Sequence, residues 1–318
     1  MTVRIVVLDD WEGFAADSGD WSALGDVDLD VVTEHIDGAE ALAERIGDTE
    51  VVVAMRERSP LPAVVIDALP RLRLLVTTGM QNAAIDLDVC RRRGVTVCGT
   101  RSHPGAASEL TWALILAVAR RTDLAVPEMR EGHWRSRVGT ALHGRRLGLL
   151  GLGRVGSTVA RVGSAFGMEV SAWTPSLTSE RAAETGAVRA GFDEVVASAD
   201  ILSLHLALTP ETAGIIDARA LGLLPPRSWL VNTARAGLVD QEALVDALDA
   251  GSIAGAALDV FDREPLAADS PLRARRNVLL TPHSGYVTDA NLARWFDDIR
   301  DNIRAWIDGN PIRLVGDA

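Results

Sequence analysis

Short apolar runs alternate with segments of helical spacing along almost the whole chain. In the first hundred residues, runs rich in Val, Ile and Leu predict strands at 3–10, 27–35, 49–57, 72–79 and 95–100. Between them, residues 38–47 and 85–94 carry apolar side chains at the spacing of a helix. Strands that are apolar on both faces need helices on both sides of their sheet. The pattern therefore predicts an α/β fold with a parallel sheet.

The same alternation resumes after a long helix, predicted at about 106–121. This helix has more apolar residues than one stripe requires, so we expect it to be widely buried. The strands predicted after it lie at 145–153, 168–173, 199–208, 228–236, 252–261 and 277–283. They amount to about six strands, the number that a dinucleotide-binding sheet requires.

A last helix is predicted at 289–309, beyond the second series of strands. Trp295, Phe296 and Trp306 give it an apolar stripe. Such a stripe must pack against a core, so we expect this helix to be docked.

A glycine-rich turn stands between the first strand of the second series and an alanine-rich helix. Gly151, Gly153 and Gly156 have the spacing G-x-G-x-x-G. The first glycine allows a tight turn, the second allows a pyrophosphate to approach the backbone, and the third allows close packing of helix and strand. The phosphates would lie at the N-terminus of the helix. The turn therefore predicts a dinucleotide site.

The next strand departs from the usual form of such a site. An Asp or Glu at its end commonly binds the adenosine ribose, whereas here the strand ends in Trp173, Thr174 and Pro175. A threonine cannot repel a 2′-phosphate, and Arg154 and Arg181 are candidate cations for one. Hydroxyl groups can also serve NAD, so NAD and NADP both stay open.

Composition narrows the classes of function. At 318 residues the chain has room for about two domains. Its net charge of −12 argues against a nucleic-acid surface. Every basic residue is Arg, which excludes chemistry that needs Lys, and Cys90 and Cys98 lack metal-type spacing. We expect buried free thiols, no metal site, no membrane-spanning segment, no signal peptide and a cytoplasmic location.

Four residues with chemical potential follow the later strands. Arg235, Asp259, Glu264 and His283 stand at or just beyond strand ends, where ligands bind in open α/β sheets. A His can donate a proton to the oxygen formed when a ketone accepts hydride. A neighbouring carboxylate orients the imidazole, and an Arg offers a planar fork to a substrate carboxylate. Singly such residues are commonly structural, but together beside a dinucleotide turn they predict a dehydrogenase.

At this point the sequence resembles a known family, the D-isomer-specific 2-hydroxyacid dehydrogenases. Glyoxylate/hydroxypyruvate reductases and phosphoglycerate dehydrogenase belong to it. The matching segments follow the order of the family and lie at 78–100, 144–170, 230–248, 255–266 and 278–286. Departures are few: Ala236 stands where many members have Gly, Thr174 replaces the ribose-binding acid, and the strand around His205 lacks a common Pro.

The resemblance implies two doubly wound parallel-sheet domains. A Rossmann dinucleotide-binding domain, residues 101–285, would be inserted in a flavodoxin-like substrate domain made of residues 1–100 and 286–318. The chain would cross between them near residues 99–104 and 285–291. The family is typically homodimeric through the cofactor domain, which suits the apolar helix at 106–121.

The resemblance also implies roles for site residues. Arg235 would bind the carboxylate of a 2-keto acid and polarise its carbonyl, His283 would be the general acid in reduction, and Glu264 would pair with His283. Arg56 and the backbone N–H groups of Thr78, Gly79 and Met80 would contact the substrate. Cofactor contacts are expected from Gly151, Gly153, Arg154, Val155, Gly156, Thr174, His205, Leu206, Thr233, Ala234, Arg235, Asp259, His283 and Gly285.

The resulting prediction is an oxidoreductase that moves a hydride between NAD(P)H and a small 2-keto acid of the glyoxylate or hydroxypyruvate type. The alternative is a dinucleotide-sensing binding protein, similar to the corepressors of this family. A third interpretation, phosphoglycerate dehydrogenase, would want a cationic site for the substrate phosphate and, in most such chains, an additional regulatory domain.

Overall fold

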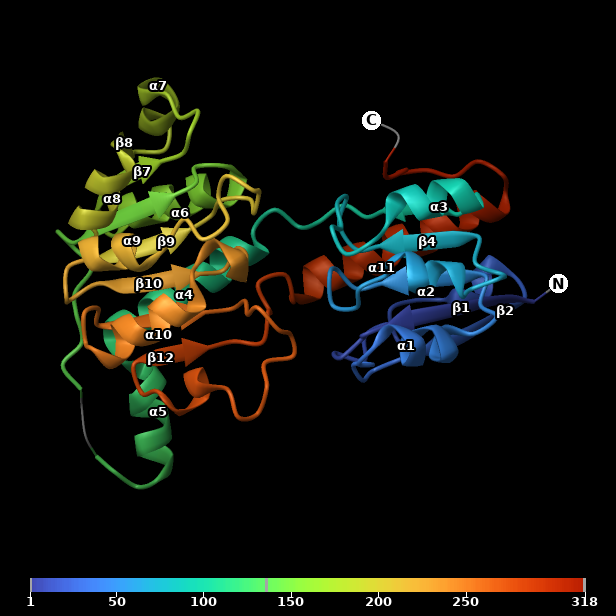
Figure 1. Ribbon diagram of the computed structural model, residues 1–318, viewed down its shortest axis with the longest axis horizontal. Helices are drawn as coiled ribbons and strands as arrows, with labels where there is room; N and C mark the ends of the chain where they lie inside the picture. The colour runs from blue at the N-terminus through green and yellow to red at the C-terminus, as the bar shows by residue number, and fades with distance from the viewer. Residues whose placement is uncertain (1, 135–136, 317–318) are drawn as a thin grey trace. The chain divides into compact units, whose positions relative to one another are not determined.

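The computed structural model describes residues 2–134 and 137–316. The chain divides into two compact units. Unit 1 is made of residues 1–103 and 287–318, and unit 2 of residues 104–286 (Figure 1). Each unit has its own parallel sheet and its own helices.

Unit 1 is built on a parallel sheet in the order β2-β1-β3-β4-β5. Its strands are β1 (Val3–Leu8), β2 (Val27–Val31), β3 (Val51–Ala54), β4 (Leu74–Thr77) and β5 (Thr96–Gly99). Its helices are α1 (Ala39–Ile46), α2 (Ala63–Asp67), α3 (Leu87–Arg93) and α11 (Asp289–Ile307), with a short 3-10 turn η1 (Trp21–Leu24). The strand order is that of a flavodoxin-like doubly wound sheet, whose switch point lies between β1 and β3.

Helices cover both faces of this sheet. On one face Leu42, Val65 and Val89 of α1, α2 and α3 join one apolar cluster with alternate strand residues. On the other face α11 packs on β4 and η1, and its Trp295 and Phe296 are fully buried. The docked stripe is therefore confirmed for these two residues. Trp306 is half-buried near the end of the helix, where the Arg73 guanidinium lies 5.9 Å from the centre of its ring.

Unit 2 is built on a seven-stranded parallel sheet in the order β12-β11-β10-β9-β6-β7-β8. The strands are β6 (Arg146–Leu150), β7 (Glu169–Trp173), β8 (Val188–Arg189), β9 (Ile201–Leu204), β10 (Trp229–Asn232), β11 (Gly255–Leu258) and β12 (Val278–Leu280). The helices are α4 (Ala106–Arg120), α5 (Thr122–Arg130), α6 (Arg154–Ala165), α7 (Ser179–Ala183), α8 (Phe192–Ser198), α9 (Ala218–Leu223) and α10 (Gln241–Asp249), with 3-10 turns η2 (Ala236–Leu238) and η3 (Pro271–Ala274).

This order is the Rossmann order with one more strand at the β12 edge. The α/β fold with two doubly wound sheets is thereby confirmed. The sequence pattern missed β8, since both of its residues are exposed and no apolar run marks it. The switch point of the sheet lies between β6 and β9, which are adjacent although five elements separate them along the chain.

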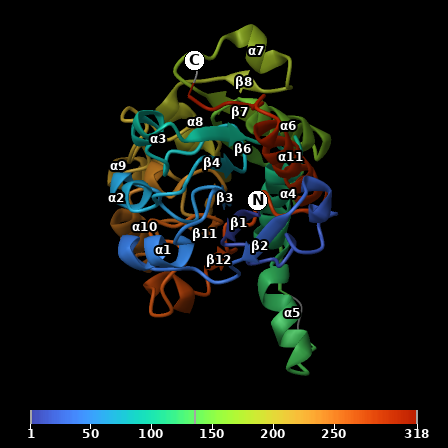
Figure 2. The ribbon, with the colours of Figure 1, turned by 90° about the vertical axis from the view of Figure 1, so that its right-hand side faces the viewer.

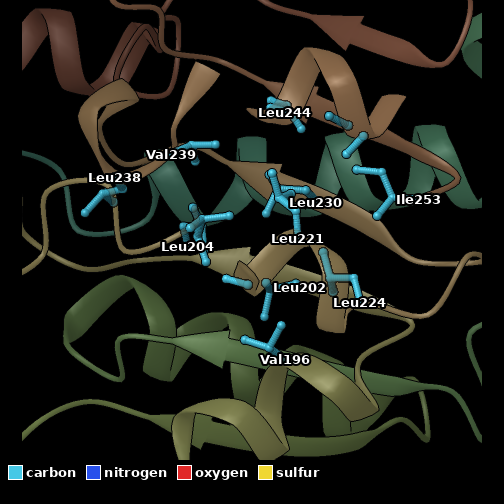
Figure 3. Close-up of a cluster of buried hydrophobic side chains, with 14 of the residues drawn as sticks. Val196, Leu202, Leu204, Leu221, Leu224, Leu230, Leu238, Val239, Leu244 and Ile253 are labelled. Atoms are coloured by element: carbon cyan, nitrogen blue, oxygen red, sulfur yellow. The ribbon is translucent and has the colours of Figure 1, made fainter. Parts of the chain in front are cut away.

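Alternate residues of the unit 2 strands belong to two separate clusters of buried apolar side chains, one on each face of the sheet. Figure 3 shows the first, in which strand residues such as Leu202 and Leu230 meet Val196, Leu221 and Leu244 of the helices. The second lies under α4 and α6 and contains Trp112, Ile115, Val159, Leu149 and Val231. Because both faces of the sheet are covered, its central strands bury residues on both faces, which produced the runs rich in Val, Ile and Leu.

Helix α4 ends at a left-handed residue, Arg121, and α5 turns away from it. In Figures 1 and 2, α5 extends beyond the sheet of unit 2. Its Val126 and Met129 are about half exposed, at 49% and 51%. Unit 2 therefore presents apolar side chains on a projecting helix.

Membrane-spanning helices, metal-ligand clusters and the two cysteines were also the subject of expectations from the sequence. In the described ranges 2–134 and 137–316, no helix combines the length and the apolar character needed to cross a bilayer. Among the same residues, no three His, Cys, Asp or Glu side chains cluster as metal ligands would. Cys90 and Cys98 are buried and unlinked, and burial raises the pKa of each thiol to about 11.

Candidate active site

The glycine turn joins β6 to α6 at the switch point of the Rossmann sheet. Gly151 has a φ of +104°, and a Cβ there would lie 2.5 Å from the carbonyl carbon of His205, the residue after β9. A Cβ on Gly156 would clash with the carbonyl oxygen of Gly151. A Cβ on Gly153 would meet nothing within 4 Å, so this position is open. Two glycines thus allow close packing, and the third leaves space for a ligand.

The N-terminus of α6 is suited to bind an anion. Gly153 is its N-cap and provides no side-chain cap. The first N–H groups of a helix lack partners within the helix, and they lie at the positive end of its dipole. Arg154, the first residue of α6, is exposed beside them. The turn and the helix together fit the pyrophosphate of a dinucleotide.

The end of β7 lies directly beside the glycine turn. The N–H of Gly151 donates to the carbonyl of Trp173 at 2.8 Å. Thr174 follows immediately, half-buried, and its carbonyl accepts from Leu177 in a tight turn. The position that commonly carries a ribose-binding carboxylate therefore holds a neutral hydroxyl. Arg181 is exposed on the nearby α7.

His205 lies against the other side of the glycine turn. Its N–H donates to the Leu150 carbonyl at 2.7 Å, and its Nε2 lies 3.0 Å from the Ser203 hydroxyl. Desolvation lowers the pKa of its imidazole to about 4, so His205 is neutral at neutral pH. Leu206 follows it, also half-buried.

A histidine and a carboxylate form a hydrogen-bonded pair at the other end of the site. Nδ1 of His283 lies 2.6 Å from Oε2 of Glu264. Oε1 of Glu264 accepts from the N–H of Phe261 at 2.9 Å. An ionised carboxylate only accepts hydrogen bonds, so Nδ1 carries the proton and Nε2 is left for other chemistry. Both side chains keep about a fifth of their surface exposed, at 18% and 23%.

Asp259 anchors the loop that carries His283. Its side chain is buried and accepts from the Thr281 hydroxyl at 2.6 Å, from the Ser284 N–H at 2.8 Å and from the Gly285 N–H at 2.8 Å. Burial raises the pKa of this carboxyl, and those hydrogen bonds oppose the rise. His283 itself has a left-handed backbone, with a φ of +51°. A strained residue of this kind persists only where its surroundings fix it, as Asp259 does here.

Arg235 stands on a turn at the end of β10 that Asn232 clamps. The buried carboxamide of Asn232 donates to the Arg235 carbonyl and accepts from the Ala234 N–H, both at 3.0 Å. Nη1 of Arg235 donates to the Ala234 carbonyl at 2.7 Å. The Thr233 hydroxyl lies 2.8 Å from that of Thr111 in α4. The backbone of Ala234 is thus already engaged within the turn.

Backbone hydrogen bonds place these loops next to one another. The Asp259 N–H donates to the Asn232 carbonyl, and the Thr281 N–H donates to the Leu258 carbonyl, both at 3.0 Å. The ends of β10, β11 and β12 are therefore neighbours. The Arg235 turn and the His283 loop extend from the same edge of the sheet.

Unit 1 brings its own predicted residues together. The Arg56 N–H donates to the Thr78 hydroxyl at 2.8 Å, and Nη1 of Arg56 donates to the Thr78 carbonyl at 3.2 Å. The N–H groups of Thr78 and Gly79 are already bonded, to the Ala54 carbonyl and the Thr100 hydroxyl. Within the described residues, the N–H of Met80 has no such partner. Of the three amides expected to bind substrate, only that of Met80 remains for a ligand.

Sequence patterns did not single out three residues of these loops. Asn232 fixes the Arg235 turn, Asn82 bonds the Arg56 carbonyl at 2.6 Å, and the Tyr286 ring contacts the His283 imidazole with centroids 5.4 Å apart. All three lie inside segments that match the family. Their polar or aromatic character at a strand end or in the loop beyond it was the only available signal.

The sheet has the Rossmann order and carries this glycine turn, and a His–Glu pair lies on the same edge as the Arg235 turn. Such a site is typical of oxidoreductases that bind a dinucleotide. The chain matches the family model of the D-isomer specific 2-hydroxyacid dehydrogenase NAD binding domain over residues 112–285. The chain therefore belongs to the D-isomer-specific 2-hydroxyacid dehydrogenase family, as its motifs predicted.

Similar proteins include enzymes with two different substrates. Glyoxylate reductase of Aeropyrum pernix is 41% identical over 260 residues, which cover 77% of each chain. D-3-phosphoglycerate dehydrogenase of Mycobacterium tuberculosis is 36% identical over 293 residues, 91% of this chain but 54% of that protein. The chain thus spans about half the length of the phosphoglycerate dehydrogenases that it matches. The solved structure of a phosphoglycerate oxidoreductase from Vibrio cholerae is 34% identical, with a TM-score of 0.92 and coverage of 96% and 99%.

Proposed function

We propose that this protein is an NAD(P)-dependent D-2-hydroxyacid dehydrogenase that reduces a small 2-keto acid of the glyoxylate or hydroxypyruvate type. The observation that supports this most directly is the 2.6 Å hydrogen bond between Glu264 and His283, on the sheet edge that also carries the Arg235 turn. The pair provides a proton donor, and the Arg provides a binding group for a carboxylate.

The cofactor would be held by the glycine turn and by the N-terminus of α6. Gly153 and the first N–H groups of α6 would take the phosphates, and Thr174 would face the adenosine ribose. When bound, NAD(P)H supplies the hydride. Thr174 places no negative charge against a 2′-phosphate, so this site can accept NADP as well as NAD.

The proton in the reaction would come from His283. Glu264 holds Nδ1, so Nε2 is the atom that donates a proton to the oxygen of the substrate carbonyl. In the reverse direction the same atom would accept the proton of the hydroxyl group. Glu264 stabilises the imidazolium and keeps the ring in one orientation. His283 thereby acts as general acid in reduction and as general base in oxidation.

The substrate carboxylate would be bound by the guanidinium of Arg235. Two parallel hydrogen bonds from this planar group fix both the position and the orientation of a carboxylate. We also propose Arg56 and the Met80 N–H as substrate contacts. Both lie at the carboxyl edge of the unit 1 sheet, where ligands of doubly wound folds bind.

Charge at that edge supports a substrate without a phosphate group. Nη2 of Arg58 lies 2.7 Å from a Glu12 oxygen, and Nε of Arg56 lies 3.5 Å from a Glu57 oxygen. Both guanidinium groups are thus compensated by a carboxylate. A phosphomonoester brings about two negative charges at neutral pH, and these arginines offer it little net attraction.

A substrate panel tests the proposal. Glyoxylate, hydroxypyruvate, pyruvate and phosphohydroxypyruvate would each be assayed with NADH and with NADPH. We expect turnover of the small keto acids and at least about tenfold lower kcat/KM for the phosphorylated one. Tight NAD(P)H binding without turnover of any keto acid would refute the enzyme and favour a dinucleotide-sensing protein.

We further propose that the protein forms a homodimer through α4 of unit 2. Glu109, Ala113 and Arg120 are exposed along one stripe of this helix, with Leu116 and Ala117 half-buried beside them. A two-fold axis near the centre of the stripe would bring Glu109 of one copy to Arg120 of the other across small apolar residues. Light scattering should give twice the mass of the chain, and Ala113→Arg should give the single mass. A wild-type monomer would refute this proposal.

A further inference from the structure

Arg56 has an unusual backbone at the end of β3. Its φ is +54°, in the left-handed region that residues other than glycine seldom adopt. Such a conformation persists where hydrogen bonds from several directions determine it, and it is concentrated at functional sites. The question is therefore what holds Arg56 in place.

The loop after β4 supplies these restraints. The Thr78 hydroxyl accepts the Arg56 N–H at 2.8 Å, and the carboxamide of Asn82 donates to the Arg56 carbonyl at 2.6 Å. Nη1 of the same arginine donates to the Thr78 carbonyl. Both backbone groups and the side chain of Arg56 are thus bonded to one neighbouring loop.

The Asn82 side chain is buried, at 7% exposure, and fully oriented. Its Nδ2 also donates to the Thr77 hydroxyl at 2.9 Å, and its Oδ1 accepts from the Ala84 N–H at 2.9 Å. Both amide hydrogens therefore have acceptors, and the carboxamide has one arrangement. This single group ties the end of β3 to the end of β4.

The guanidinium lies directly over Gly79. A Cβ at Gly79 would clash with Nη1 of Arg56, so only a glycine leaves room for the guanidinium there. Met80, whose amide is open, is the next residue. The cation and the open amide are thus held side by side on one loop.

We propose that Asn82 is a positioning residue that holds Arg56 and the Gly79–Met80 turn in their substrate-binding arrangement. Without its amide, the Arg56 carbonyl loses its partner and the left-handed backbone loses one of its restraints. The guanidinium would then lose its fixed place over Gly79. This inference depends on the proposed function, because it takes Arg56 to be a substrate contact.

Steady-state kinetics of Asn82→Leu, a neutral replacement of similar volume, tests the proposal. We expect the KM for the keto acid to rise about 5- to 30-fold, with the KM for NAD(P)H and the kcat changed less than twofold. Asn82→Ala serves if the Leu variant does not fold. The matched control is Thr49→Val, which removes another buried hydrogen bond to a backbone carbonyl, that of Ile46, at the opposite end of β3. This control should lower Tm without changing either KM.

A double-mutant cycle separates positioning from simple loss of stability. If Asn82 acts through Arg56, Asn82→Leu should raise KM much less in an Arg56→Ala background than in the wild type. Equal effects in both backgrounds would overturn the proposal, as would an unchanged KM in Asn82→Leu or in Arg56→Ala.

A measurement without substrate keeps this inference separate from the proposed function. Nitrogen-15 relaxation of the Arg56 Nε–H should show greater side-chain motion in Asn82→Leu than in the wild type and in Thr49→Val. A wild type that reduces no keto acid refutes the proposed function, yet greater motion of Arg56 would still support its positioning by Asn82. An equally rigid Arg56 in all three proteins would overturn it.

Discussion

Replacing Glu264 by Gln would test the proposed proton donor most directly. The carboxylate of Glu264 accepts two hydrogen bonds, from Nδ1 of His283 and from the Phe261 N–H. A glutamine of the same shape has one acceptor oxygen and one donor nitrogen. The glutamine oxygen can accept from only one of these two N–H groups. The remaining N–H group then faces the glutamine NH₂ group or water.

The two possible arrangements have different consequences, and both lower the rate. If the Gln oxygen stays on Phe261, its NH₂ group faces Nδ1, and the imidazole must take the tautomer with hydrogen on Nε2 and without the supporting carboxylate. If the oxygen faces His283 instead, the Phe261 N–H loses its acceptor and the loop loosens. An unsatisfied buried donor costs about 1–3 kcal/mol. We use the lower value because the residue 264 side chain that faces this N–H is partly exposed, at 23%.

We therefore expect a small loss of stability and a large loss of rate. The free energy of unfolding should fall by about 1 kcal/mol. The kcat for keto-acid reduction should fall by about 10²- to 10⁴-fold, since removal of the orienting carboxylate from a catalytic His has effects of this size. NADH binding should be unchanged, and the exposed Glu242→Gln serves as the control. A kcat within threefold of the wild type would show that Glu264 does not support the proton donor.

Four other substitutions test separate parts of the site. His283→Ala should lower keto-acid reduction by about 10²-fold or more while NADH still binds; near-normal turnover would remove His283 from its role. Arg235→Lys should raise KM and lower kcat together, because Lys cannot form the two parallel hydrogen bonds that Arg forms with a carboxylate. An unchanged kcat/KM would argue that Arg235 does not contact the substrate. Thr174→Asp should shift the ratio of kcat/KM values towards NADH, because the new charge repels a 2′-phosphate; a constant ratio would show that this loop does not select the cofactor. In the folded protein the pKa of His205 is about 4, below its ordinary 6.5. Between these two pH values only the unfolded chain binds a proton at His205, so the free energy of unfolding decreases as the pH falls from 6.5 to 4. His205→Asn should reduce this loss by about 2 kcal/mol between pH 7 and pH 4.5, measured by urea titration at both values, and identical pH dependence in both proteins would refute the lowered pKa of His205.

The sequence was informative where a local rule applies. Unbroken apolar runs between helices mark strands buried on both faces, and this predicted both parallel sheets. The spacing of Gly151, Gly153 and Gly156 predicted the turn at the switch point, because Gly151 and Gly156 leave no room for a Cβ and Gly153 keeps open space at the helix N-terminus. Arg235, Glu264 and His283 were recognisable since they follow strands whose carboxyl ends share one edge. The short strand β8 escaped detection, as its two residues are exposed.

Only the tertiary structure decided which polar groups are already bonded and which remain for a ligand. The sequence offered the amides of Thr78, Gly79 and Met80 equally, yet the Ala54 carbonyl and the Thr100 hydroxyl take the first two. Asn82 and Asn232 resemble ordinary loop residues until strand register brings them to the carbonyls of Arg56 and Arg235. The physical reason is how far apart along the chain the interacting groups lie. The apolar pattern of a strand or helix and the spacing of a glycine turn can be read from neighbouring residues along the chain, whereas these hydrogen bonds depend on how strands and loops pair in space.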